Sequence, residues 1–214
     1  MKSSLVSLML ITLSLLLSPA SPAGDALADA MSRAPIKNFL SEGFGSLNAK
    51  APAETKEFGR LVGLWHVETE MASGSGEFVP MAPGLWAWKY ALDGFAVSDL
   101  WYQSAENLPS YMANLGRDYL LTANRVYAVA EHRWHVAWMA NGAGSVMGAD
   151  VGTFTAQLVD GELVMSSGPG SFGLQRVIFS EFSDDSFRWR SDYSQDDGKT
   201  WTTVMRMRAK RLEK

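Results

Sequence analysis

Tryptophan and methionine are the residues of this chain whose types and spacing point most directly to a ligand. The 214 residues include eight Trp, ten Phe and eleven Met, but only three His and no Cys. Large aromatic rings and flexible thioethers commonly line pockets for apolar molecules. We therefore predict that several of these side chains line a cavity, while others fill the core. The predicted lining residues are Trp65, Trp86, Trp88, Trp101, Trp138, Trp189 and Met205.

Two arginines near the C-terminus could add a charged contact. Arg188 and Arg206 are predicted to share one face of a hairpin, with Glu181 opposite Arg188. If that face were interior, its surplus positive charge could hold a ligand carboxylate through paired hydrogen bonds. The alternative is a solvated outer ladder, because charges that alternate with Phe, Trp and Met normally point outwards.

Acid–base catalysis is a second class of function that the sequence permits. Asp99, Glu181 or His135 could act as the acid or base of an isomerase, cyclase or hydrolase, provided that the group is buried beside a cavity. The chain has no Gly-x-Ser-x-Gly motif and no phosphate-binding Gly-rich loop before a helix. His132 and His135 should point to opposite faces of a strand, whereas a metal site needs converging ligands. We predict no metal and no cofactor, and we assign no catalytic residue.

The elements that must position these residues are strands. From residue 64 onwards, apolar and polar residues alternate with a period of two, and no helical crossover separates the segments. This predicts an all-β, antiparallel meander, which should close into a roughly ten-stranded β-barrel because open edges invite aggregation. Such an interior is either packed or able to hold one small ligand. The expected strands are 64–71, 85–92, 95–102, 119–122, 126–130, 132–139, 151–158, 163–166, 175–182, 187–193 and 202–208.

The strongest hairpin signal is the Asp-Asp-Gly turn near residues 196–199. It predicts one aromatic face and one charged face on the two strands that flank it. The expected cross-strand neighbours are Tyr193 with Trp201, Trp189 with Met205, and Phe187 with Met207.

The N-terminus is typical of a signal peptide. Lys2 precedes an apolar run at 5–17, which is shorter than the roughly 20 residues of a membrane span, and small residues follow up to Ala23. We predict cleavage after Ala23 and a periplasmic or secreted bacterial protein; an uncleaved signal anchor is the alternative. Without Cys, neither a disulfide nor a lipid-modified cysteine can form.

Three regions are therefore expected: a signal peptide at 1–23, an Ala/Pro-rich arm or linker at 24–57 and a barrel domain at 58–214. A short amphipathic helix within 54–62 could cap one end of the barrel. The arm, or an open strand edge, could also recruit a protein partner, which would make the chain an interaction module. A net charge of −4 and a pI near 5.4 argue against nucleic acid as a partner. The sequence does not specify an oligomeric state.

Three segments carry a resemblance to a known family: Leu61-Val-Gly-Leu-Trp65, Leu92-Asp-Gly-Phe95 and Asp197-Gly-Lys-Thr-Trp201. They resemble a family of uncharacterised bacterial proteins with a lipocalin-like fold of the calycin group, related to nitrobindins, over roughly residues 54–211. The resemblance implies a lipocalin-like barrel, but the family has no assigned catalytic residues to carry over. Distant relatives bind hydrophobic small molecules, and nitrobindins hold haem through a His.

That His matches none of His66, His132 and His135. A second, local likeness lies at Ser194-x-Asp196-x-Gly198-x-Thr200-Trp201, which resembles the Asp box of sialidases. The chain has a single copy, which we interpret as turn chemistry. The leading hypothesis is an exported, non-enzymatic protein that binds a small apolar or amphipathic molecule inside a barrel.

The export hypothesis predicts the mass of the mature protein. Expressed with its own N-terminus in a bacterial host, the protein recovered from the periplasm or medium should begin at Gly24. Intact mass spectrometry checks this outcome. An exported form that retains residues 1–23 would instead indicate the signal anchor.

Overall fold

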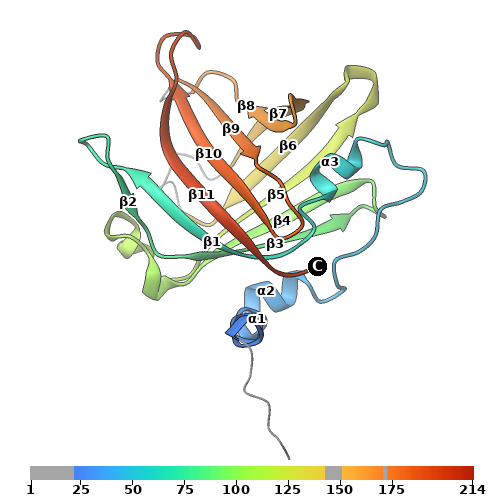
Figure 1. The fold of residues 1–214 in the computed structure, drawn as a ribbon, viewed down its shortest axis with the longest axis horizontal. Coiled ribbons are helices and arrows are strands. Elements are labelled where there is room, and N and C mark those ends of the chain that lie inside the picture. The colour runs from blue at the N-terminus through green and yellow to red at the C-terminus, as the bar shows by residue number, and fades with distance from the viewer. Residues whose placement is uncertain (1–21, 143–150, 171–172) are drawn as a thin grey trace, which may run out of the picture.

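Ten antiparallel strands form a closed barrel (Figure 1). The computed structural model describes residues 22–142, 151–170 and 173–214. The strands follow in chain order, and β1 closes the ring by pairing with β11, for example at Val67 and Ala209. This confirms the predicted antiparallel barrel. The barrel strands are β1 (Gly63–Ala72), β3 (Gly84–Ala91), β4 (Ala96–Gln103), β5 (Tyr119–Ala128), β6 (Arg133–Ala140), β7 (Val151–Val159), β8 (Glu162–Ser166), β9 (Leu174–Ser180), β10 (Ser186–Ser194) and β11 (Thr202–Glu213).

Short elements decorate the ends of this ring. The strand β2 (Phe78–Pro80) pairs with the end of β1 and extends beyond the barrel. Short 3₁₀-helices lie in the connections between β4 and β6. They are η1 (Ala105–Asn107), η2 (Ser110–Leu115) and η3 (Val129–Glu131).

One strand is longer than the sequence indicates. We expect separate strands at 119–122 and 126–130, but the structure has the single strand β5. The polar stretch between them does not end the strand, because Asn124 is exposed on the outer face while Arg125 is buried inside. The buried arginine is accommodated by an ion pair with Asp99 on the neighbouring strand.

A short helix, α3 (Thr55–Gly59), plugs one end of the barrel, as predicted. Its Phe58 is fully buried and meets Trp134 edge to face, with ring centroids 4.9 Å apart. Phe179 also contacts the Phe58 ring edge to face, at 5.9 Å. Such aromatic contacts add to the stabilisation that burial alone provides.

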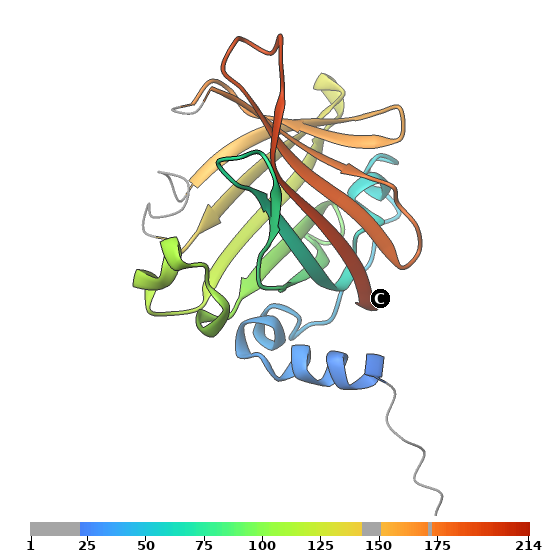
Figure 2. The ribbon, with the colours of Figure 1, turned by 60° about the vertical axis from the view of Figure 1, so that its left-hand side comes forward.

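The segment 24–57 is not a free arm in the structure. It contains the beginning of α3, all of a further helix α2 (Ala34–Phe39) and most of another, α1 (Pro22–Ser32). The helices α1 and α2 lie against the outside of the barrel (Figure 2). Ile36 is buried against Leu64, Ala87 and Leu100, which point outwards from β1, β3 and β4. The outer face of the three strands is apolar at these positions, so this part of it needs a cover. No helix among residues 22–142, 151–170 and 173–214 is long and apolar enough to cross a membrane.

The closing hairpin keeps Trp189, Met205 and Met207 on its inward face as predicted, but not Trp201, which stacks against Arg176, and its register differs. Trp189 lies opposite Met207, two residues beyond the expected Met205, and Tyr193 lies opposite Thr202. The differences arise from a longer loop and from a bulge between Ser191 and Asp192. A shift of two residues preserves the side-chain alternation, which explains why the aromatic face still points inwards.

Asp196 organises the loop of this hairpin in the manner that the Asp-box likeness implies. Its Oδ1 accepts hydrogen bonds from the Thr200 amide and the Ser194 hydroxyl, both at 2.8 Å, and its Oδ2 accepts one from Thr200 Oγ1 at 2.7 Å. Trp201 Nε1 donates to the Gly198 carbonyl at 3.0 Å. The hydrogen bonds from Thr200, with a smaller contribution from Ser194, lower the pKa of Asp196 from 3.8 to about 2.

This pKa predicts a specific pH dependence of stability. A carboxylate with a depressed folded pKa stabilises the fold above its unfolded pKa of 3.8, and the contribution is lost as the pH falls towards about 2. Asp196→Asn should therefore lower the urea midpoint at about pH 5, and the difference from wild type should vanish near pH 2. The neighbouring Asp197→Asn removes the same charge and serves as the control. A deficit of Asp196→Asn that is independent of pH would contradict this account.

Candidate ligand-binding site

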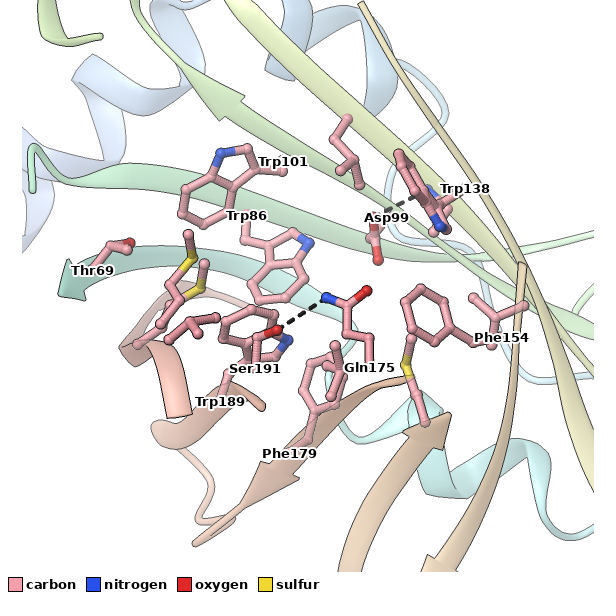
Figure 3. Close-up of a pocket in the computed structure, with 18 of the residues that line it drawn as sticks. Thr69, Trp86, Asp99, Trp101, Trp138, Phe154, Gln175, Phe179, Trp189 and Ser191 are labelled. Atoms are coloured by element: carbon pink, nitrogen blue, oxygen red, sulfur yellow. Dashed lines mark hydrogen bonds between the residues drawn. The ribbon is translucent and has the colours of Figure 1, made fainter. Parts of the chain in front are cut away.

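The interior of the barrel contains a cavity of about 220 Å³ that is partly open to solvent (Figure 3). Aromatic rings form much of its wall, and Met81, Met112, Met165, Met205 and Met207 add flexible thioethers. The aromatic lining residues are Trp86, Trp101, Tyr119, Trp138, Phe154, Phe179, Trp189 and Tyr193. A wall of this composition can accommodate a range of apolar shapes.

The cavity occupies the part of the interior that the aromatic plug does not fill. Near α3, Trp65 packs edge to face on Phe187 at 4.7 Å, and Trp88 and Trp134 are completely buried. Towards the other end of the barrel, the inward-pointing side chains surround a space that they do not fill. One end of the barrel is therefore a packed core, and the space for a ligand lies beyond it.

A buried ion pair lies in the cavity wall. Asp99 on β4 points inwards and is 0% exposed, and Arg125 on β5 is 3% exposed; Arg125 Nη1 lies 2.5 Å from Asp99 Oδ2. The guanidinium is stacked on Trp88, with Cζ 4.3 Å from the ring centroid. Asp99 Oδ1 accepts a hydrogen bond from the Ala123 amide at 3.2 Å.

Burial acts on the protonation of both partners. It raises the pKa of Asp99, opposed chiefly by the charge of Arg125. It lowers the pKa of Arg125, opposed by the charge of Asp99. Burial thus disfavours both charges, and the opposite charge of each partner offsets part of this effect on the other.

The pair leaves several polar atoms without hydrogen bonds. Asp99 Oδ2, Arg125 Nε, Arg125 Nη1 and Trp86 Nε1 are buried, and none has a hydrogen-bond partner within the described ranges. The 2.5 Å contact is therefore an ion pair without hydrogen-bond alignment. A buried polar group left in this state costs roughly 1–3 kcal/mol, so such groups call for an explanation.

A neutral polar pair lies on the opposite wall. Gln175 on β9 donates from Nε2 to Ser191 Oγ on β10 at 3.0 Å, and both residues line the cavity (Figure 3). In a ring of ten strands, β9 and β10 lie across from β4 and β5. The interior therefore offers polar groups on two facing walls, with aromatic rings between them.

The predicted aromatic and methionine lining residues divide into two groups in the structure. The cavity wall contains Trp86, Trp101, Trp138, Trp189 and Met205. Trp65 and Trp88 are also interior but belong to the packed end, where they contact other rings rather than the cavity.

Arg188 and Arg206 lie on the outside of the barrel, which corrects the interior placement considered for them. Their side chains are 46% and 47% exposed, and each forms an ion pair, Arg188 with Glu181 at 2.7 Å and Arg206 with Glu70 at 2.6 Å. Successive side chains of a strand point to opposite faces. Because Trp189 and Met207 point inwards, Arg188 and Arg206, which directly precede them, must point outwards. The solvated outer ladder is the arrangement observed.

Of the three acid–base candidates, Asp99 is the one that is buried beside the cavity. Glu181 and His135 are exposed on the outer surface, and His135 Nε2 lies 3.1 Å from Glu131. Within the described residues, no group of three or more His, Asp or Glu side chains could hold a metal ion.

Sequence reasoning missed Arg125, Gln175 and Ser191. The signal for Arg125 was available: if the period of two continues through β5, then Tyr119, Leu121, Ala123 and Arg125 share one face. Gln175 and Ser191 become neighbours only through the pairing of β9 with β10, where Ser191 lies opposite Val177.

No protein-family model matches the chain, and no curated protein sequence matches it. Solved structures with a similar arrangement include an S-type phycobiliprotein lyase, CPES, from Guillardia theta, with 13% sequence identity and a TM-score of 0.46 over 73% of this chain and 90% of that one. A redesigned β-barrel has 10% identity and a TM-score of 0.37 over 77% and 98% of the two chains. Another, mFAP1 bound to DFHBI, has 10% identity and a TM-score of 0.34 over 72% and 96%. At these values we transfer no function to this chain.

The buried pair generates a prediction about stability. Arg125→Met leaves the Asp99 carboxylate buried without its counter-charge, and should destabilise the protein by about 3–5 kcal/mol at neutral pH. The double variant Asp99→Leu/Arg125→Met replaces the pair by apolar groups and should recover most of that loss. Urea denaturation measures both changes.

Arg206→Met is the matched control, because it breaks an exposed ion pair and should cost no more than about 1 kcal/mol. Equal losses for Arg125→Met and Arg206→Met would contradict the description of the buried pair.

Proposed function

We propose that this protein is an exported binding protein that holds one small, largely apolar molecule inside its barrel. The observation that carries the proposal is the 220 Å³ cavity with a wall of Trp, Phe and Met side chains beside a fully packed core. An interior that served stability alone would be filled, since proteins pack to high density and cavities are destabilising.

The volume of the cavity limits the size of the ligand. An apolar cavity of about 150 Å³ accepts benzene, and drug-sized molecules occupy pockets of about 300–1,000 Å³. The volume here, about 220 Å³, lies between these values. It favours a molecule of one or two rings over a larger one such as a porphyrin.

Export is part of the proposal and is supported by the sequence of residues 1–23. The interaction-module hypothesis stays a prediction; within the described part of segment 24–57, the apolar side of α1 and α2 already contacts the barrel.

An enzymatic role is a second candidate, favoured by one observation. Asp99 is fully buried and lines the cavity, which is the placement that an acid or base inside the barrel requires. Its ion pair with Arg125 argues for a positioning or recognition role instead. A bound compound that is recovered chemically changed would support catalysis; one that is recovered intact supports binding.

The binding proposal predicts a measurable stabilisation by small aromatic compounds. At a concentration about 100 times the dissociation constant, naphthalene or indole should stabilise the protein by about 2.7 kcal/mol, which corresponds to a rise in Tm of about 5–10 °C. Native mass spectrometry should show one bound molecule.

Two variants locate the binding site. Ala123→Phe places a ring in the cavity, between Asp99 and Trp138 in the register of the sheet, and should abolish the shift in Tm. Ala137→Phe adds the same ring at an exposed position on the outer face of β6 and should leave the shift intact. The proposal fails if no compound shifts the wild-type Tm, or if both variants respond like wild type.

A further inference from the structure

The polar atoms beside the cavity indicate the class of molecule that the site takes, an inference that rests on the proposed function. Asp99, Arg125 and Trp86 all contribute to the cavity wall, and each carries a buried polar atom without a hydrogen-bond partner in the described ranges. Figure 3 shows the Asp99 carboxylate directed towards the space between Trp86 and Phe154. Asp99 Oδ2 and Arg125 Nη1 already contact each other as an ion pair. A carboxylate oxygen can accept a second hydrogen bond and the guanidinium has further N–H groups, so one polar group on a ligand could bind both partners.

The pattern of donors and acceptors defines what that group must offer. Asp99 Oδ2 is an acceptor, whereas Arg125 Nε, Arg125 Nη1 and Trp86 Nε1 are donors. Oδ2 and Nη1 are 2.5 Å apart. A complementary ligand therefore carries a donor and an acceptor as neighbours on one edge, the arrangement in which N–H lies beside C=O.

The charge of the site excludes ionic ligands. Asp99 and Arg125 are the two charged side chains among the described residues of the cavity wall, and their charges cancel. An anion or a cation would bring an uncompensated charge into an interior of low dielectric constant, where desolvation is costly. A neutral ligand keeps the pair balanced.

The shape of the wall completes the description. Trp86 meets Trp101 at an interplanar angle of 88°, with centroids 5.5 Å apart, and it lies 5.7 Å from Phe179. Flat rings pack well on such faces and edges, and the volume admits one or two of them. We infer that the ligand is an uncharged, flat molecule of one or two rings whose edge bears an N–H next to a C=O, as in a cyclic amide.

Three compounds of similar shape test this inference on the full chain. 2-Quinolone has the N–H and C=O edge, naphthalene has no polar group, and 2-naphthoate carries a negative charge. Isothermal titration should show that 2-quinolone binds at least about tenfold more tightly than either of the others, the gain expected from two hydrogen bonds. In Asp99→Leu/Arg125→Met, the ratio of the 2-quinolone and naphthalene dissociation constants should approach one.

Trp86→Phe provides a second variant that keeps the ring and removes the indole N–H, and it should reduce the same ratio by a smaller factor. Equal binding of naphthalene and 2-quinolone to wild type overturns the inference but leaves the proposed function standing. Tightest binding of 2-naphthoate, or a preference for 2-quinolone that both variants retain, also overturns it. If none of the three compounds binds, the proposed function fails together with the inference.

Discussion

The number of strands in the ring is the constraint on which the rest of this structure depends. A barrel of about eight strands is just wide enough for its own side chains to fill. Here the sheet closes with ten, through the hydrogen bonds between β1 and β11. The wider interior needs extra material, and α3 supplies it at one end by inserting Phe58 among the large rings. Because backbone pairing sets the diameter, single side-chain changes can reshape the remaining space but cannot remove the width that creates it.

This wide interior also explains how polar residues can be placed on its walls. Gln175 donates a hydrogen bond to Ser191, and Asp99 and Arg125 balance each other's charge. A buried ion pair contributes little net stability compared with apolar residues of the same volume. Its presence in the wall of a cavity, rather than in the packed end, therefore fits recognition better than support of the fold.

The barrel and most of its inward-pointing residues could be predicted from the sequence. The alternation of apolar and polar residues with a period of two indicates both the strands and the face on which each side chain lies. Trp189 shows why the result is robust: its partner moved from Met205 to Met207, yet its face did not change. The ion pair was beyond the sequence because Asp99 and Arg125 meet only when β4 and β5 align with Asp99 opposite Ala123. The packing of α1 and α2 against the barrel was also missed, since it depends on the apolar outer face of β4, which can be recognised only once the inner face is known.

The pairing of β1 with β11 has a consequence for the order of events during folding. Leu64 is a partner of Glu213, so the contact that closes the ring joins the first barrel strand to the last residues of the chain. Hairpins between neighbouring strands can form as each one becomes available, but contacts of such long sequence separation form slowly. The ring cannot close until β11 has been synthesised, and until then β1 remains an open edge on its β11 side. A nascent or truncated chain that lacks β11 would therefore expose this edge to other molecules.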